Sequence, residues 1–241
     1  LGDDRGSGVN SFCMSAAVGD LDGDGLLDLY LAGTLEQFAL VDSAHGYFDM
    51  ASSYGWEDSV YPQMPWGAQV TDVDNDGLVD VVVTTSDFSH ESGHLLYPIM
   101  VHHQVERGVW QQDSEALGLT QEANGRGLLL KDLNEDGVLD LYIADFERSP
   151  WLYLSDGCTE DNWIEVTAPS GSLVQVEADG QVWVALATRH ASYGGHMRPT
   201  AHIGLGEVET LDRVTVTVPW VGEKVLVGPV SARSRLQWGE L

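Results

Sequence analysis

Three short stretches of the chain place oxygen-bearing side chains at the same spacing. They run from Asp20 to Asp28, from Asp72 to Asp80 and from Asp132 to Asp140. Each has a carboxylate or carboxamide at its first, third, fifth and ninth positions, a glycine at its sixth and an apolar residue at its seventh. Ca²⁺ takes about six to eight oxygen ligands, and alternate side chains on a tightly curled loop converge on one point. The spacing therefore predicts three calcium-binding loops.

The predicted ligands are the side chains at positions one, three, five and nine and the backbone carbonyl at position seven. Glycine at position six permits a sharp bend where a Cβ is often strained. Without a cation the clustered carboxylates repel one another, so three Ca²⁺ ions are the expected cofactors. The predicted ligands are Asp20, Asp22, Asp24, Leu26 and Asp28 in the first loop, Asp72, Asp74, Asp76, Leu78 and Asp80 in the second, and Asp132, Asn134, Asp136, Val138 and Asp140 in the third.

The third loop differs from the other two in its ligand charge. It has Asn134 where the others have Asp22 and Asp74, which removes one formal charge. Because ligand charge is one determinant of calcium affinity, we expect the third site to be the weakest. Glu135, at position four of this loop, is expected to point away from the ion.

Two other interpretations of the loops fit part of the pattern. An EF-hand requires a bidentate Glu at position twelve between flanking helices. Position twelve is Leu31, Val83 and Ile143, and a β-rich apolar run follows each loop in place of an amphipathic helix. Acidic surface turns without metal are the second alternative, which three copies in register disfavour.

The elements around the loops indicate a β array. The loops begin at residues 20, 72 and 132, and periods of this size are typical of propeller blades. Short apolar runs on both sides predict a unit of strand, calcium loop, strand and variable connection. Residues 38–41 and 151–154 predict further strands, and residues 47–51 and 110–113 predict outer strands that end a blade. The expected fold is all-β, with β-propeller-type blades in a partial propeller or arc.

The pattern changes near residues 156–158, after which no calcium loop occurs. Asp179-Gly180 is a signal for a two-residue hairpin. We expect two domains, with three calcium-binding repeats at residues 1–160 and a β-sandwich-like domain at residues 161–241. Alternating apolar residues predict strands in this second domain at 163–166, 174–177, 182–186, 214–218 and 224–227.

These motifs resemble known families. The calcium loops resemble the FG-GAP/VCBS repeats of integrin-like β-propellers, and residues 162–166, 202–206 and 212–219 resemble the ASPIC/UnbV domain. Their combination is similar to bacterial relatives of cartilage acidic protein, which implies a secreted or cell-surface protein without a settled enzymatic activity. Family members carry more than three repeats. The resemblance therefore implies that further blades precede this sequence, that another chain completes the array, or that the fold is an open arc.

Composition limits the partners. The 241 residues carry a formal net charge of −27 at pH 7, so nucleic acid and anionic membrane surfaces are poor partners. No run of about 18 apolar residues predicts a transmembrane helix, so membrane insertion is not expected. Calcium sites of this type predict an extracellular, cell-surface or periplasmic location. Cys13 and Cys158 form one disulfide there or remain two buried thiols.

The favoured function is a calcium-stabilised, non-catalytic interaction or adhesion module. The blade count predicts a larger assembly, formed with a protein partner or with further copies of the chain. Glycan binding is an alternative, because aromatic side chains such as Trp56, Trp66 and Trp110 stack on sugars when they are exposed and fill the core when they are not.

An enzyme is the alternative from a different class. His90 and His94 fit the H-E-x-x-H pattern of a zinc hydrolase, which requires a helix. Ser92-Gly93 and the preceding apolar run indicate a loop instead. His102 and His103 lie nearby, but adjacent residues of a strand point to opposite faces.

Overall fold

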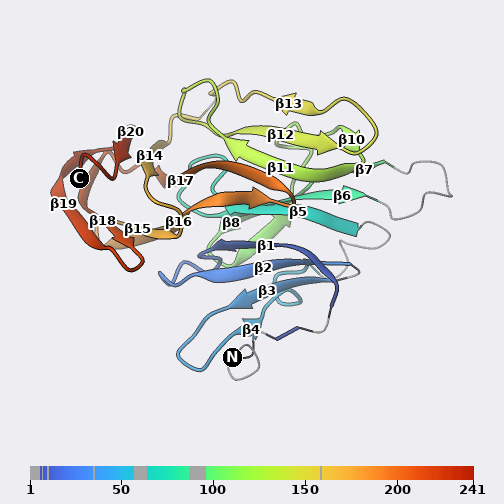
Figure 1. Cartoon of the computed structure of the whole chain (residues 1–241), viewed down its shortest axis with the longest axis horizontal. Helices are drawn as coiled ribbons and strands as arrows, with labels where there is room; N and C mark the ends of the chain where they lie inside the picture. The colour runs from blue at the N-terminus through green and yellow to red at the C-terminus, as the bar shows by residue number, and fades with distance from the viewer. Residues whose placement is uncertain are drawn as a thin grey trace.

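The computed structural model describes residues 6, 8–9, 11–34, 36–56, 64–86, 96–157 and 159–241, without the side chains of residues 190 and 191. This part of the chain is all-β, as predicted, with several small antiparallel sheets followed by one large sheet (Figure 1). None of its segments forms a helix long and apolar enough to cross a membrane.

Three small sheets contain the three predicted loops, and each loop joins the first two strands of its sheet as a hairpin. The first is β1 (Cys13–Gly19), β2 (Asp28–Gly33), β3 (Gln37–Val41) and β4 (Phe48–Asp49). The second is β5 (Met64–Thr71), β6 (Asp80–Ser86), β8 (Met100–Glu106) and β9 (Val109–Gln112). The third is β11 (Gly125–Lys131), β12 (Asp140–Asp145) and β13 (Trp151–Tyr153), while β7 (Tyr97–Pro98) pairs with β10 (Glu122–Ala123). The predicted outer strands correspond to β4 and β9.

The three sheets pack face to face in chain order, which forms an open arc of blades (Figure 1). Tyr30 of the first sheet shares a core with Val81 and Val83 of the second. Val82, on the opposite face of the second sheet, shares a core with Leu141 of the third. Because strand side chains alternate between faces, each sheet uses one face for the preceding sheet and the other for the following one.

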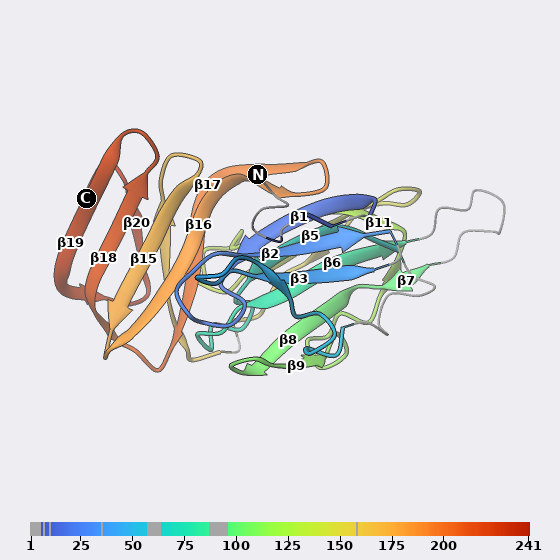
Figure 2. The ribbon, with the colours of Figure 1, turned by 90° about the horizontal axis from the view of Figure 1, so that it is seen from below.

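The C-terminal strands form one sheet of their own. Their order is β19-β18-β15-β16-β17-β14-β20, and β14 pairs with β20 in parallel. The sheet coils until it is nearly closed, so the sandwich-like packing is made by a single sheet around its core (Figure 2). The strands are β14 (Asn162–Thr167), β15 (Ser172–Ala178), β16 (Gln181–Ser192), β17 (Gly195–Gly206), β18 (Thr210–Val218), β19 (Gly222–Ser231) and β20 (Ser234–Gln237).

The Asp179-Gly180 hairpin is confirmed, with φ values of 50° and 77°. The predicted C-terminal strands lie within β14, β15, β16, β18 and β19, whereas β17 and β20 were not predicted. The sheet begins at Asn162, beside the expected boundary at residues 160 and 161. Independent folding of residues 161–241 stays a prediction.

The long β16–β17 hairpin reaches across the inner strands β1, β5 and β11 of the three small sheets (Figures 1 and 2). A cavity of about 420 Å³ remains at this junction. Its lining includes Ala16, Val70 and Leu130 from the small sheets, with Trp183 and Met197 from the hairpin. The C-terminal sheet therefore packs against all three repeats.

Candidate metal centres

One hydrogen-bond scaffold folds all three loops. A carboxylate oxygen at position one accepts the backbone N–H of the glycine at position six, over 2.9 Å at Asp20, 2.8 Å at Asp72 and 2.9 Å at Asp132. The carboxylate at position five accepts the N–H of position seven in every loop. The glycines at position six, which are Gly25, Gly77 and Gly137, have φ values of 87°, 94° and 95°, and residues other than glycine rarely adopt such values. The predicted need for glycine is confirmed.

The carboxylate at position nine ties each loop to a later part of its sheet. Asp28 accepts the N–H of Leu21 and of Asp42, both over 2.7 Å. Asp80 and Asp140 accept the equivalent pairs, from Val73 and Gln104 and from Leu133 and Ser155. Each oxygen accepts one bond and has a further lone pair for a cation. The ninth carboxylate therefore has a structural role that its spacing alone did not predict.

Oxygen ligands cluster in the first two loops. Asp20, Asp22 and Asp28 each place one oxygen within 4.8 Å of the others, and so do Asp72, Asp74 and Asp80. A third group on the second loop joins Asp74 and Asp76 to His103. These Asp-rich groups are of the kind that holds a metal ion, although they identify no particular ion.

Burial changes the proton affinity of these carboxylates. It raises the pKa of Asp28 to about 7, with smaller contributions from Asp22 and Asp20. Burial also raises the pKa of Asp80 to about 7. The pKa of Asp72 lies well above its usual range because the side chain is buried and faces neighbouring carboxylates. A bound cation favours the charged forms, so the donor set suits a hard divalent ion such as Ca²⁺.

The third loop is arranged differently. Arg235 of β20 forms an ion pair with Asp132, and Asn134 Nδ2 donates to Asp136 Oδ2 over 2.8 Å. Within the described residues, the acidic side chains of this loop form no three-oxygen group like those of the other two. A calcium ion in this loop stays a prediction. Glu135 is exposed, as expected for position four.

The second loop is built into the interface with the C-terminal sheet through Asn75. This side chain is 1% exposed. Its Nδ2 donates to the Gly137 carbonyl of the third loop over 3.0 Å, and its Oδ1 accepts from His202 Nε2 over 2.7 Å. The Asn75 carbonyl accepts the N–H of Gly206 over 2.8 Å. Asn75 therefore joins two loops and the C-terminal sheet.

Two tryptophans of the C-terminal sheet contact the sixth-position glycines. Trp183 Nε1 donates to the Gly77 carbonyl over 3.1 Å. The Trp163 indole packs so closely on Gly137 that an added Cβ would overlap it. The interface therefore requires glycine at position 137 in addition to its φ angle, whereas an added Cβ at Gly77 would lie 3.3 Å from Trp183 Nε1.

Several residues of these centres carried no signal in the loop spacing. His103 Nε2 lies 3.1 Å from Asp74 Oδ2, and Arg107 donates to the Gly23 carbonyl of the first loop. Together with Arg235, they bring positive or ionisable groups to the three loops from distant parts of the chain. The packing of one sheet against another places Arg107 and Arg235 there, and the pairing within the second sheet places His103.

The zinc interpretation rests on His90 and His94, which lie outside the described residues. The neighbouring His102 is buried, with Nε2 2.9 Å from Gln37 Oε1, and it stacks on Trp56. Burial lowers the pKa of His102 to about 3. His103 faces Asp74 instead, so the two adjacent histidines do not converge, as expected.

The tryptophans considered for sugar binding pack inside the fold. Trp56 is buried against Tyr30 and His102. Trp66 is also buried, beneath the Arg126 guanidinium at 3.9 Å. Trp110 is half-buried and packs on Trp56. Core packing is therefore the arrangement seen for all three.

Cys13 is an exposed, free thiol at the start of β1, so the expectation of a buried thiol is wrong for this residue. Cys158 lies outside the described residues.

Residues 166–239 match the family model described as ASPIC and UnbV. The match covers the C-terminal sheet from within β14 to β20 and contains the motifs at residues 202–206 and 212–219, whereas it includes only the last residue of the motif at residues 162–166. FG-GAP and VCBS repeats are not detected, and no curated protein matches the chain. The chain is therefore a β protein with a C-terminal ASPIC and UnbV domain.

Proposed function

We propose that this ASPIC and UnbV domain-containing protein is a calcium-stabilised interaction module that works outside the cytoplasm, without catalysis, within a larger assembly. The observation that carries the proposal is the convergence of three carboxylates in each of two equivalent loops. Asp20, Asp22 and Asp28 would hold one Ca²⁺, and Asp72, Asp74 and Asp80 a second. The resemblance of the loops to FG-GAP/VCBS repeats supports this assignment.

A bound cation would act on stability in this proposal. Asp28 and Asp80 each connect their loop to a later segment of the same sheet through backbone N–H groups. Neutralising their charge removes the repulsion between buried carboxylates without breaking these bonds. The second loop also carries the Asn75 contacts to the C-terminal sheet, so ion binding supports the junction between the two parts of the chain.

The third loop is proposed as the weakest of three calcium sites. Its Asp132 is paired with Arg235, and a guanidinium competes with Ca²⁺ for the same oxygen. The loss of one carboxylate at Asn134 acts in the same direction.

Support for a non-catalytic role comes from what surrounds the clustered carboxylates. Their partners are mainly backbone N–H groups of the loops and sheets, which are suited to hold a shape. The nearby His202 is engaged with Asn75 and packs against Trp163. A zinc hydrolase at His90 and His94 is the competing proposal.

Thermal unfolding of the full chain tests the proposal. Excess chelator is expected to lower the melting temperature, and added Ca²⁺ is expected to restore it. Ligand at 100 times its Kd stabilises by about 2.7 kcal/mol per site. A double variant, Asp22→Asn with Asp74→Asn, should lose less of its melting temperature in chelator than the wild-type chain does, because one charged ligand is removed from each of the two loops. Asp22 and Asp74 are half-buried, so the substitutions leave the fully buried carboxylates unchanged.

Metal analysis of the purified chain separates the two proposals. Bound calcium without zinc supports the structural role, whereas stoichiometric zinc that is lost on His90→Ala supports the hydrolase. A melting temperature that does not respond to chelator would overturn the calcium proposal.

A further inference from the structure

The cavity at the junction lies between the small sheets and the β16–β17 hairpin, and both parts of the chain supply its wall. The inner strands β1, β5 and β11 are edge strands of their sheets, and the hairpin crosses them. The volume of about 420 Å³ falls within the range of roughly 300–1,000 Å³ that is usual for small-molecule sites. The cavity is therefore large enough for a small ligand.

The hairpin turns an apolar surface toward this cavity. Because Ala185 packs against the core of the C-terminal sheet, its neighbours Val184 and Leu186 point to the opposite face, toward the small sheets. Val70 of β5 and Leu130 of β11 line the cavity from the side of the small sheets. Most of the wall is apolar, so water finds few hydrogen-bond partners along it.

A smaller part of the wall is polar. It consists of Lys131 of β11, Glu165 of β14 and His202 of β17, which we call the polar corner. Glu165 and His202 lie opposite each other on neighbouring strands, and Lys131 forms an ion pair with the buried Glu165 carboxylate. Burial lowers the pKa of His202 to about 4, so its imidazole is neutral at pH 7. The polar corner therefore carries no net charge.

The polar corner has hydrogen-bonding capacity that the described part of the chain does not use. An ammonium group has three donors and a carboxylate has about four acceptor positions, yet the Lys131 and Glu165 side chains bind only each other among the described residues. His202 Nε2 donates to Asn75 Oδ1, so Nδ1 is the acceptor of the neutral ring. This buried atom has no hydrogen-bond partner in the same part of the chain. The corner thus offers both donors and acceptors.

We propose that this cavity binds an uncharged amphipathic small molecule, whose apolar body lies against Val70 and Leu186 and whose hydroxyl or amide end meets the polar corner. Such an end group donates to the Glu165 carboxylate and accepts from the Lys131 ammonium. A charged end group would bring an unbalanced charge into a largely buried site, which is costly. The site goes beyond the proposed function, because it requires no ion in the loops.

Binding of octan-1-ol to the full chain tests the proposal, with a methionine methyl group as the local signal. The chain has five methionines, of which Met197 lines the cavity and Met50 of the first repeat does not. In NMR spectra of methyl-labelled methionine, octan-1-ol should shift the Met197 signal until it saturates and leave the Met50 signal in place. Met197→Leu identifies the signal. A Met197 signal that does not respond up to the solubility limit of the alcohol, or equal shifts of both signals, overturns the proposal.

Ligands of similar size test the chemical class. Octanoate and octylammonium replace the hydroxyl by a charged group, and each should bind at least about tenfold more weakly than octan-1-ol. Methyl heptyl ether is an isomer of octan-1-ol that accepts a hydrogen bond but donates none. It should also bind about tenfold more weakly, because it leaves the Glu165 carboxylate without a donor from the ligand. If either charged ligand or the ether binds as tightly as the alcohol, the proposal is wrong.

A variant of the wall locates the site. Leu186→Trp adds bulk to the apolar side of the cavity and should abolish the Met197 shift. Val227→Trp is the matched control, because Val227 is an exposed apolar side chain on β19 that does not line the cavity. It should bind octan-1-ol as the wild-type chain does. Unchanged binding by a folded Leu186→Trp variant contradicts the assignment.

A second variant gives an answer if Leu186→Trp unfolds. Lys131→Met with Glu165→Leu replaces the ion pair by apolar residues of similar size, an exchange that is often tolerated in buried sites. This double variant should still bind methyl heptyl ether but should lose the preference for octan-1-ol. A preference of about tenfold that survives in the double variant shows that the polar corner does not recognise the ligand, and the proposal fails.

Discussion

Replacement of Asn75 by Ala tests how strongly the second loop is tied to the C-terminal sheet. The substitution removes the donor to the Gly137 carbonyl and the acceptor for His202 Nε2. Both groups would be left buried without these bonds, and each such loss costs about 1–3 kcal/mol. Asn75 also has φ of 67°, where alanine is less favourable by about 1 kcal/mol. The expected loss of unfolding free energy is therefore about 3–7 kcal/mol, a large part of a typical domain's stability.

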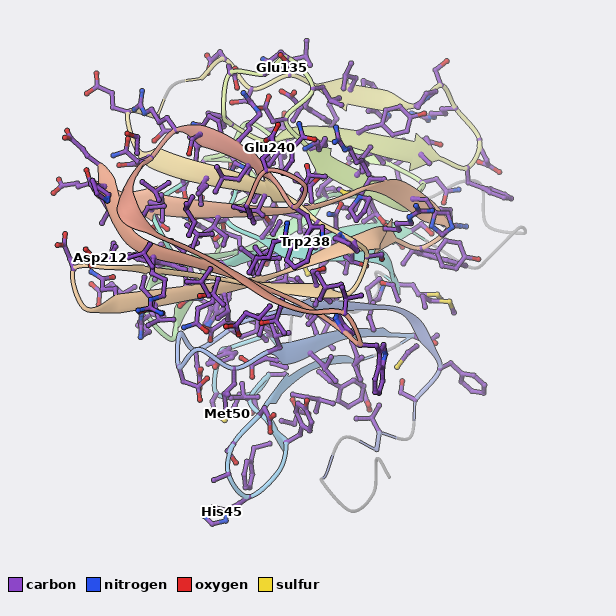
Figure 3. The ribbon with its side chains drawn as sticks, turned by 60° about the vertical axis from the view of Figure 1, so that its left-hand side comes forward. His45, Met50, Glu135, Asp212, Trp238 and Glu240 are labelled. Atoms are coloured by element: carbon purple, nitrogen blue, oxygen red, sulfur yellow. The ribbon has the colours of Figure 1, made fainter. Side chains whose placement is uncertain are left out.

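Glu135→Ala is the matched control, because Glu135 occupies position four of the third loop with φ of 65°. Its side chain is exposed, and Figure 3 shows it at the outer edge of the molecule. This variant keeps the left-handed backbone and breaks no buried contact, so its stability should change by less than about 0.5 kcal/mol. Asn75→Gly separates the two effects further, because glycine adopts positive φ without strain.

Urea unfolding at fixed, saturating Ca²⁺ measures all three variants. The midpoint should fall strongly for Asn75→Ala and Asn75→Gly, with the slope unchanged if the transition stays two-state. If Asn75→Ala and Glu135→Ala agree within about 1 kcal/mol, the buried amide does not hold the junction and the reasoning is refuted.

Three further predictions concern the loops. In chelator, the melting temperature should fall as pH rises from 6.5 to 7.5. The reason is that the pKa of Asp28 and that of Asp80 are about 7 in the folded chain, whereas an Asp of the unfolded chain has a pKa of about 3.9. The folded chain then binds more protons than the unfolded chain, and added Ca²⁺ should cancel the trend; a rise with pH in chelator contradicts it. Arg235→Gln should lower stability in chelator by about 1–3 kcal/mol, since it leaves the buried Asp132 carboxylate without its half-exposed charged partner. The same variant should tighten calcium binding at the third loop; calorimetry that shows unchanged affinity there counts against the competition. Gly25→Ala and Gly137→Ala both place a Cβ at positive φ, at a cost of about 1–2 kcal/mol. Only the Cβ of Gly137→Ala overlaps the Trp163 indole, so this variant should have the lower melting temperature. Equal melting temperatures for the two variants would show that the indole moves aside at no cost.

Features that depend on neighbouring residues were predictable from the sequence. The glycine at position six of each loop, the hairpin at Asp179-Gly180 and the outward direction of Glu135 follow from spacing and turn chemistry. Alternating apolar residues likewise placed strands such as β15 and β18. These predictions succeeded because the interactions that decide them act over a few residues.

Contacts between distant residues needed the tertiary structure. No local pattern indicated that Arg235 reaches Asp132, that His202 reaches Asn75, or that the ninth carboxylates accept bonds from N–H groups later in the chain. The coiling of the C-terminal strands into one sheet also depends on pairing β14 with β20.

The repeat itself shows where the sequence stops being informative. Tyr30 and Tyr142 occupy the same position after their loops, and both follow an aspartate and a leucine. Tyr30 is buried and Tyr142 is exposed because another sheet stacks on the first repeat and none in the described chain stacks on the third. Burial is set by the neighbouring sheet, which the residue and its local sequence do not specify.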